Sequence, residues 1–162
     1  MNLKYILPIN HITNWIIFYT NEIGKPITSV KLQQLLYYCQ VWHLIYLDAP
    51  LFLEDVQGWA RGPVVPSQYQ RFLDLPRKAL LIANEKTSTL PDFNDGQADL
   101  LTHVVNKYIS ESDLYTELNL FREIPFINTR VNYEIYERGT DIVSYEDILE
   151  YYGARKGILF NL

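Results

Sequence analysis

The side chains best suited to metal binding or nucleophilic catalysis are three histidines and one cysteine: His11, His43, His103 and Cys39. Their spacing does not form a metal-ligand pattern, so we predict no metal and no cofactor. His43 lies within a long apolar segment, and we interpret it as a buried histidine with satisfied hydrogen bonds. Cys39 falls on the apolar face of the same segment, which is typical of a small buried hydrophobic residue.

Carboxylates gather at Glu54–Asp55 and at Glu117 with Glu123. General acid–base catalysis needs such groups in a defined geometry, which sequence spacing alone does not establish. The sequence also contains no glycine-rich phosphate loop and no nucleophile elbow. We therefore predict that the protein is not an enzyme, with a small hydrolase using Glu117 or Glu123 as an alternative.

The segment WARGPVVP, residues 59–66, joins a large aromatic ring, a cation and a rigid bend. Trp and Arg are the residue types that most often dominate protein interfaces. Two interpretations stay open. In one, Gly62–Pro63 forms a turn and Trp59 packs in the core; in the other, the segment is an exposed loop in which Arg61 presents a contact surface.

Helices must position these residues. Apolar side chains recur every three or four residues between 28 and 47, which predicts a central helix capped by Thr28. This helix is apolar on almost every side and is therefore expected to be buried. Further helices are predicted over residues 8–22, 66–72, 95–109, 112–121 and 144–153, and short strands over 56–60 and 79–83. Residues 132–138 stay unassigned, and the tail 154–162 either folds back or extends freely.

These elements predict a mainly α fold, a compact helical bundle around the buried central helix with one or two short β-strands. The composition, 48% hydrophobic and 20% charged, predicts a single globular domain over residues 1–162. No apolar run reaches membrane-spanning length, and the N-terminus lacks the features of a signal peptide. A single cysteine fits a reducing cytoplasm. The net charge of −5 disfavours a phosphate backbone and is compatible with a basic protein partner.

The run from Thr28 to Phe72 resembles the Panacea antitoxin domain, also called the SocA-like domain. The family pattern is T-x-x-K-L-Q-K-L-L-Y-Y-x-Q-x-W-H-L, then P-L-F, then A-W-x-x-G-P-V-x-P-x-x-Y. The residues that match it in register are Lys31, Leu32, Gln33, Leu35, Leu36, Tyr37, Tyr38, Gln40, Trp42, His43, Pro50, Leu51, Phe52, Trp59, Gly62, Pro63, Val64, Pro66 and Tyr69. Val41 stands where the family commonly has glycine.

The C-terminal half resembles the family pattern L-T-H-x-E-x-P-W-x-x-A-R more loosely. This chain keeps Glu123, Pro125 and Arg130, while Phe121 replaces the histidine and Phe126 replaces the tryptophan. The replacements preserve packing, but any chemical task of that histidine is lost in this chain.

The resemblance implies a mainly helical domain that acts as the antitoxin of a toxin–antitoxin pair. Members neutralise unrelated toxins by direct protein contact, a branch delivers its toxin to a protease, and the domain also occurs in phage-encoded proteins. The expected partners are therefore a cognate protein toxin encoded by an adjacent gene and, for an adaptor, a protease.

We predict that the contact surface lies around the start of the central helix and the adjoining bend. Its candidate residues are Lys31, Gln33, Tyr37, Trp59, Arg61 and Tyr69. A structural role is predicted for Gln40, Trp42, His43, Gly62, Pro63 and Pro66. Each contact candidate also has a scaffold alternative: Lys31 as a solvated charge at a helix end, and Gln40 or Tyr37 as partners of buried backbone groups near the bend.

A different class of function is a DNA-binding repressor of the chain's own operon. The helices over 8–22 and 28–47 could mimic a helix-turn-helix. However, the second of them carries Leu, Tyr and Trp where polar residues would read bases, so nucleic-acid binding is not expected.

Overall fold

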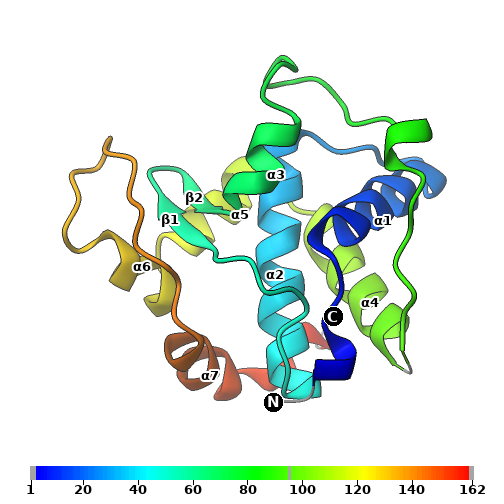
Figure 1. The fold of residues 1–162 in the computed structure, drawn as a ribbon. Helices are drawn as coiled ribbons and strands as arrows, with labels where there is room; N and C mark the ends of the chain where they lie inside the picture. The colour runs from blue at the N-terminus through cyan, green and yellow to red at the C-terminus, as the bar shows by residue number, and fades with distance from the viewer. Residues whose placement is uncertain (1–2, 95, 161–162) are drawn as a thin grey trace.

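The computed structural model of the chain describes residues 3–94 and 96–160 (Figure 1). Within them the fold is mainly helical with one small two-stranded sheet, which confirms the predicted fold class. The α-helices are α1 (Ile9–Glu22), α2 (Ser29–Leu47), α3 (Pro66–Arg71), α4 (Gln97–Ile109), α5 (Asp113–Leu120), α6 (Ile124–Arg130) and α7 (Tyr145–Gly153). The strands are β1 (Gln57–Trp59) and β2 (Gly62–Val64), and short 3-10 helices cover Leu3–Tyr5, Glu85–Thr87 and Lys156–Leu159.

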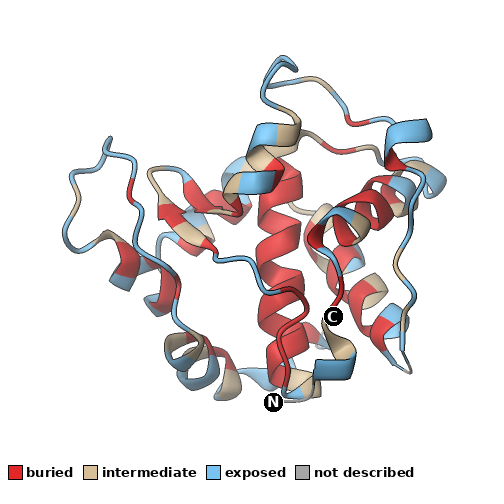
Figure 2. Ribbon diagram, in the orientation of Figure 1, coloured by how far each residue is buried: buried red, intermediate tan, exposed pale blue. Residues whose placement is uncertain are grey.

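Helix α2 runs through the middle of the molecule, and its burial follows from its sequence. Thr28 caps it by accepting a hydrogen bond from the backbone amide of Lys31 at 3.1 Å. Asp48 ends it in the left-handed conformation, with φ of 51°. Every residue from 31 to 45 is buried, as the red ribbon of α2 shows (Figure 2). The predicted buried central helix is confirmed.

The other elements surround α2 and cover its apolar side chains. Helices α1 and α4 lie on one side, the β1–β2 hairpin, α6 and α7 lie on the other, and α3 lies near its N-terminal end (Figure 1). Buried residues of α1, α2, α4 and α7 share one hydrophobic cluster, whose burial is the main stabilising contribution. The single-domain organisation over residues 1–162 stays a prediction.

The β1–β2 hairpin differs in detail from the expected strand and bend. The strands pair in antiparallel fashion with Trp59 opposite Gly62, so the chain turns at Ala60–Arg61. The predicted turn at Gly62–Pro63 is therefore misplaced, because these residues belong to β2 and Gly62 itself has a φ of 143°. Pro63 is tolerated because a two-stranded sheet has only edge strands. Pro66 opens α3, as predicted, where its missing amide costs little.

Residues 79–83 form no strand. The amide of Leu81 donates instead to the carbonyl of Ile27 at 2.8 Å, a single backbone bond to the turn before α2. Helix α6 is absent from the sequence prediction, because the pattern around Ile124–Pro125 indicates a break. Pro125 instead lies in the first turn of α6, where proline is compatible with a helix.

The C-terminal tail folds back onto the core, with Leu159 buried and the Phe160 ring 5.1 Å from that of Tyr46. Asp95, the predicted start of the fourth helix, lies outside the described residues, and α4 is described from Gln97. Across the described part of the chain, no helix has both the length and the apolar character needed to cross a membrane.

Candidate partner-binding groove

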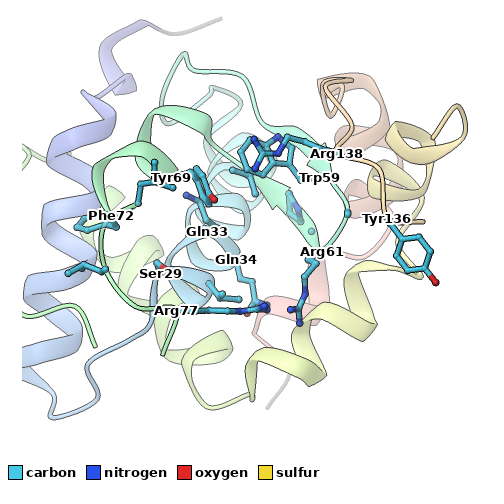
Figure 3. Close-up of a pocket in the computed structure, with 17 residues that line it drawn as sticks. Ser29, Gln33, Gln34, Trp59, Arg61, Tyr69, Phe72, Arg77, Tyr136 and Arg138 are labelled. Carbon is cyan, nitrogen blue, oxygen red and sulfur yellow. The ribbon is translucent and has the colours of Figure 1, made fainter. Parts of the chain in front are cut away.

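A groove of about 460 Å³ opens between the start of α2, the β1–β2 hairpin, α3 with the chain that follows it, and residues 136–138 (Figure 3). Its polar and aromatic lining residues are Ser29, Gln33, Gln34, Trp59, Arg61, Tyr69, Phe72, Arg77, Tyr136 and Arg138. Its other lining residues are Val30, Ala60, Gly62, Pro63, Val64, Leu73 and Leu75. Gln33, Trp59, Arg61 and Tyr69, four of the predicted contact residues, thus line one surface.

Gln33 fixes the hairpin to α2 from the floor of the groove. Its side chain is buried, and Oε1 accepts a hydrogen bond from the backbone amide of Val65 at 2.9 Å. This bond satisfies the amide that follows β2. Gln40 also satisfies buried backbone groups, as its scaffold alternative predicts, but these belong to Leu51 and Phe52 and not to the Gly62–Pro63 segment. The Tyr37 hydroxyl instead lies beside that of Tyr152. Among the described residues, the Nε2 group of Gln33 has no hydrogen-bond partner, so it remains a free donor.

Trp59 and Tyr69 form an aromatic wall of the groove. Their rings meet edge to face with centroids 4.9 Å apart. The guanidinium of Arg138 lies 3.9 Å from the centroid of Trp59 and 5.6 Å from that of Tyr69, a cation–π arrangement. Trp59 Nε1 donates to Gln57 Oε1 at 2.9 Å. Trp59 is half-buried and lies in β1. It is therefore neither packed fully in the core nor part of an exposed loop, the two alternatives considered from the sequence.

Arg61 extends from the hairpin turn and forms a two-point ion pair with Glu117 of α5. Its Nε donates to Oε1 at 3.3 Å, and its Nη2 donates to Oε2 at 3.1 Å. The Arg61 side chain is 57% exposed, so water weakens the pair and its contribution to stability is small. Arg61 Nη1 makes no hydrogen bond to any described residue, which leaves one edge of the guanidinium open.

Residues 131–142, which we call the rim segment, follow α6, and Tyr136 and Arg138 of this segment line the groove (Figure 3). The amide of Gly58 donates to the carbonyl of Asp141 at 2.9 Å, and Arg130 Nη1 donates to the carbonyl of Gly58 at 3.0 Å. A Cβ on Gly139 would lie 2.5 Å from that same carbonyl oxygen, so the close crossing requires glycine. These contacts hold the rim segment against β1.

Lys31 and Tyr37 do not line the groove. Lys31 is buried, and its Nζ donates to Thr116 Oγ1 at 3.1 Å and to the carbonyl of Tyr108 at 3.3 Å. It is therefore not a solvated charge, and burial lowers its pKa while the nearby Asp113 opposes that shift. Tyr37 is fully buried. We revise the predicted contact role of both residues to a scaffold role, because a partner cannot reach their side chains in this conformation.

Gln40 satisfies the backbone where the chain leaves α2. Its Oε1 accepts from the amides of Leu51 at 2.7 Å and Phe52 at 3.3 Å, and its Nε2 donates to the carbonyl of Phe52 at 2.9 Å. Nε2 also donates to the hydroxyl of Tyr145 at 3.2 Å. The three backbone bonds fix the irregular chain around Leu51 to the central helix, and the bond to Tyr145 connects that helix to α7.

Trp42 and His43 also have structural contacts. Trp42 Nε1 donates to the hydroxyl of Tyr108 at 3.0 Å. His43 Nδ1 lies 2.6 Å from the carbonyl of Ala49 and must therefore carry the proton, which leaves Nε2 to accept from Gln97 Nε2 at 2.9 Å. Burial lowers the pKa of His43, so the neutral ring is favoured. The predicted satisfied core histidine is confirmed.

Glu123 lies within a tyrosine cluster on the side of α2 that faces α7. Tyr38 donates to its Oε1 at 3.0 Å, Tyr152 donates to its Oε2, and the hydroxyls of Tyr37 and Tyr152 lie 3.3 Å apart. Burial raises the pKa of Glu123 to about 7 from its ordinary value of 4.5, although the two tyrosine hydrogen bonds act in the opposite direction.

The two alternative functions find little support in this geometry. Glu117 is held by Arg61 and Glu123 by tyrosines, and neither carboxylate lines the groove. No group of three or more His, Cys, Asp or Glu side chains among the described residues is placed to hold a metal ion. Because α2 is buried along its length, the α1–α2 pair does not present a recognition helix.

Sequence reasoning missed Arg77, Tyr136 and Arg138. Arg77 lies in the irregular chain after α3, and Tyr136 lies in the rim segment with 91% of its surface exposed. Neither segment has a periodic pattern from which the direction of a side chain could be predicted. A local signal exists for the rim segment as a whole, because exposed Ile135 and Tyr136 interrupt a run of polar residues. The position of Arg138 beside Trp59 depends on a contact between distant parts of the chain.

Comparison with known proteins identifies the class of this mainly helical protein with an open groove. A family model described as "Antitoxin SocA-like, Panacea domain" matches residues 32–115, slightly more than half of the chain. The chain therefore belongs to the SocA-like, Panacea-domain family of antitoxin-like proteins. The match covers α2 from Leu32, the hairpin, α3, α4 and the start of α5, whereas the rim segment lies beyond it. Searches of the curated proteins and of the solved structures gave no match.

Proposed function

We propose that this protein is an antitoxin that neutralises a cognate protein toxin by binding it directly through the groove, without catalysis and in the cytoplasm. The observation that carries the proposal is the position of Gln33, Trp59, Arg61 and Tyr69. All four lie within the family-matched residues and line one open surface. Half-buried aromatic rings and an exposed arginine are the side chains that typically dominate binding energy at interfaces.

Co-expression tests the proposal. The product of the adjacent gene should arrest growth when expressed alone, growth should recover when this chain is co-expressed, and the two proteins should co-purify. Failure of both rescue and co-purification would refute the proposed function.

A charge swap tests the contribution of the groove. Arg61→Glu should weaken capture of the toxin, because it removes the exposed guanidinium. Combining it with Glu117→Arg restores an ion pair between the hairpin and α5 but leaves no cation at position 61. Capture that stays weak in the double variant indicates contact by Arg61, whereas full recovery indicates that Arg61 acts only through Glu117.

Direct binding and delivery to a protease are separable mechanisms. If the chain acts only by occupying the toxin, the half-life of the toxin in cells should be unchanged or longer when the chain is present. A shortened half-life, with capture in vitro intact, would instead support the adaptor mechanism that the family resemblance implies.

A further inference from the structure

We propose that the groove binds an acidic segment of the partner protein, through carboxylate contacts to Arg61, Arg77 and Arg138. This inference rests on the proposed function and specifies the chemistry of the segment that enters the groove. It also reverses the expectation from net charge, which favours a basic partner.

The charge of the groove is opposite to that of the protein. The chain has 19 Asp and Glu residues against 14 Lys and Arg residues, for a net charge of −5. The residues that line the groove nevertheless include three arginines and no carboxylate. Within the described residues, Arg77 and Arg138 form no ion pair, and Arg61 is the one arginine of the groove with a carboxylate partner. An acidic ligand would therefore supply charges that this surface lacks.

The unpartnered polar groups around the groove include several donors and one buried acceptor, Gln34 Oε1. Arg61 keeps Nη1 open, the guanidinium of Arg77 has no partner among the described residues, and Gln33 Nε2 is a free donor on the floor. In Figure 3 the side chains of Arg61 and Arg77 reach toward the same end of the groove, whereas Arg138 covers Trp59 at the other end. Guanidinium groups bind carboxylates with two parallel hydrogen bonds, so the groove is suited to more than one acidic side chain.

The apolar half of the lining favours a polypeptide over a nucleic acid. Val30, Val64 and Phe72 line the groove, and so do Leu73 and Leu75, which are 52% and 46% exposed. In an acidic peptide that also carries an aliphatic or aromatic residue, the apolar residue would cover these side chains while the carboxylates bind the arginines. A phosphate backbone would contact the same arginines but would leave the leucines exposed to water.

A peptide selection tests this proposal even while the toxin is unidentified. A random library of linear peptides is selected on the immobilised full chain, and enriched peptides are titrated by fluorescence anisotropy against wild type, Arg77→Glu and Lys78→Glu. Lys78 is the matched control, because it is an exposed cation next to Arg77 that does not line the groove. Both substitutions change the net charge by the same amount.

We expect the enriched peptides to combine Asp or Glu with apolar residues. Arg77→Glu should weaken their binding on the order of tenfold or more, because a charge-assisted contact is lost. Lys78→Glu should change the affinity far less. Replacing the peptide carboxylates by amides should reproduce the loss in wild type, and added salt should weaken binding of the acidic peptides.

Enrichment of basic or uncharged peptides, failure to enrich any peptide, or equal losses in the two variants would overturn the proposal. Tighter binding of a labelled oligonucleotide, lost in Arg77→Glu, would also overturn it and would assign the groove to nucleic acid. Circular dichroism of both variants establishes that they are folded as the wild type is.

The same variants separate this inference from the proposed function. If wild type and Arg77→Glu capture the adjacent gene product equally well, the acidic-segment proposal fails while toxin binding stands. If that product is never captured but acidic peptides bind in an Arg77-dependent manner, the antitoxin proposal fails while the ligand chemistry of the groove stands.

Discussion

Replacing Glu123 by glutamine should remove a pH dependence of stability that originates in the tyrosine cluster. The pKa of Glu123 is raised to about 7 in the folded protein, against an ordinary value of 4.5. Between these two values the folded state binds more protons than the unfolded state. The stabilisation from this group is therefore fully present below about pH 4.5 and is lost as the pH rises through about 7.

The size of the effect follows from that difference in pKa. A separation of about 2.5 units corresponds to about 3 kcal/mol of unfolding free energy between the acidic and the alkaline limits. Burial is the largest cause of the raised pKa, and the charge of Glu111 adds to it. The hydrogen bonds from Tyr152 and Tyr38 and the charge of Arg155 oppose it. Glutamine keeps an acceptor for a tyrosine hydroxyl but cannot ionise.

Urea denaturation followed by circular dichroism at about pH 5 and about pH 8 measures this effect. The stability of Glu123→Gln relative to wild type should increase by up to about 3 kcal/mol from the lower to the higher pH. Taking the difference between the two proteins removes the opposite trend from His43, whose pKa is lowered by burial. Glu150→Gln, at an exposed carboxylate of α7, is measured alongside as the matched control variant. A constant difference between Glu123→Gln and wild type would refute the reasoning.

Three further predictions address the scaffold. Gln40→Leu should lower the unfolding free energy, measured by urea denaturation, by about 2–5 kcal/mol, because it leaves buried backbone groups without partners. A loss below about 0.5 kcal/mol would contradict this prediction. Gly58→Ala should lower the thermal midpoint, since its Cβ would lie 1.8 Å from Thr129 Oγ1 and overpacking costs about 1–3 kcal/mol. Gly153→Ala, whose Cβ meets nothing within 4 Å, should not do so. The thiol of Cys39 is buried and its pKa is raised, so it should react with a disulfide reagent only after urea unfolds the chain. Fast labelling of the native protein would contradict the burial of this thiol.

The sequence predicts the elements whose pattern is local. Helix α2 has a cap at Thr28 and apolar residues at regular spacing, and α1, α4, α5 and α7 have similar signals, so each lies close to its predicted range. Helix α6 lacks such a signal because Pro125 falls in its first turn. The hairpin turn is misplaced because Gly62 and Pro63, typical turn residues, lie within β2 instead.

The site is predictable only in part, because burial and long-range contact decide it. Trp59, Arg61 and Tyr69 follow from the residue types found at interfaces. Lys31 shows the limit of that approach, since its charge is satisfied inside the molecule by groups from α4 and α5 that no local pattern connects to it. Arg138 reaches Trp59 across almost half of the chain length, so its role requires the structure.

The groove combines two parts of the chain that differ in their relation to the family. Its floor and aromatic wall come from the matched residues, while Tyr136 and Arg138 belong to the rim segment, which lies beyond the match and is joined to β1 through Gly58. An irregular segment anchored at both ends can accept new residues between its anchors without repacking the core. Chimeras that exchange this short stretch between family members would therefore offer a direct route to reprogramming which protein is captured.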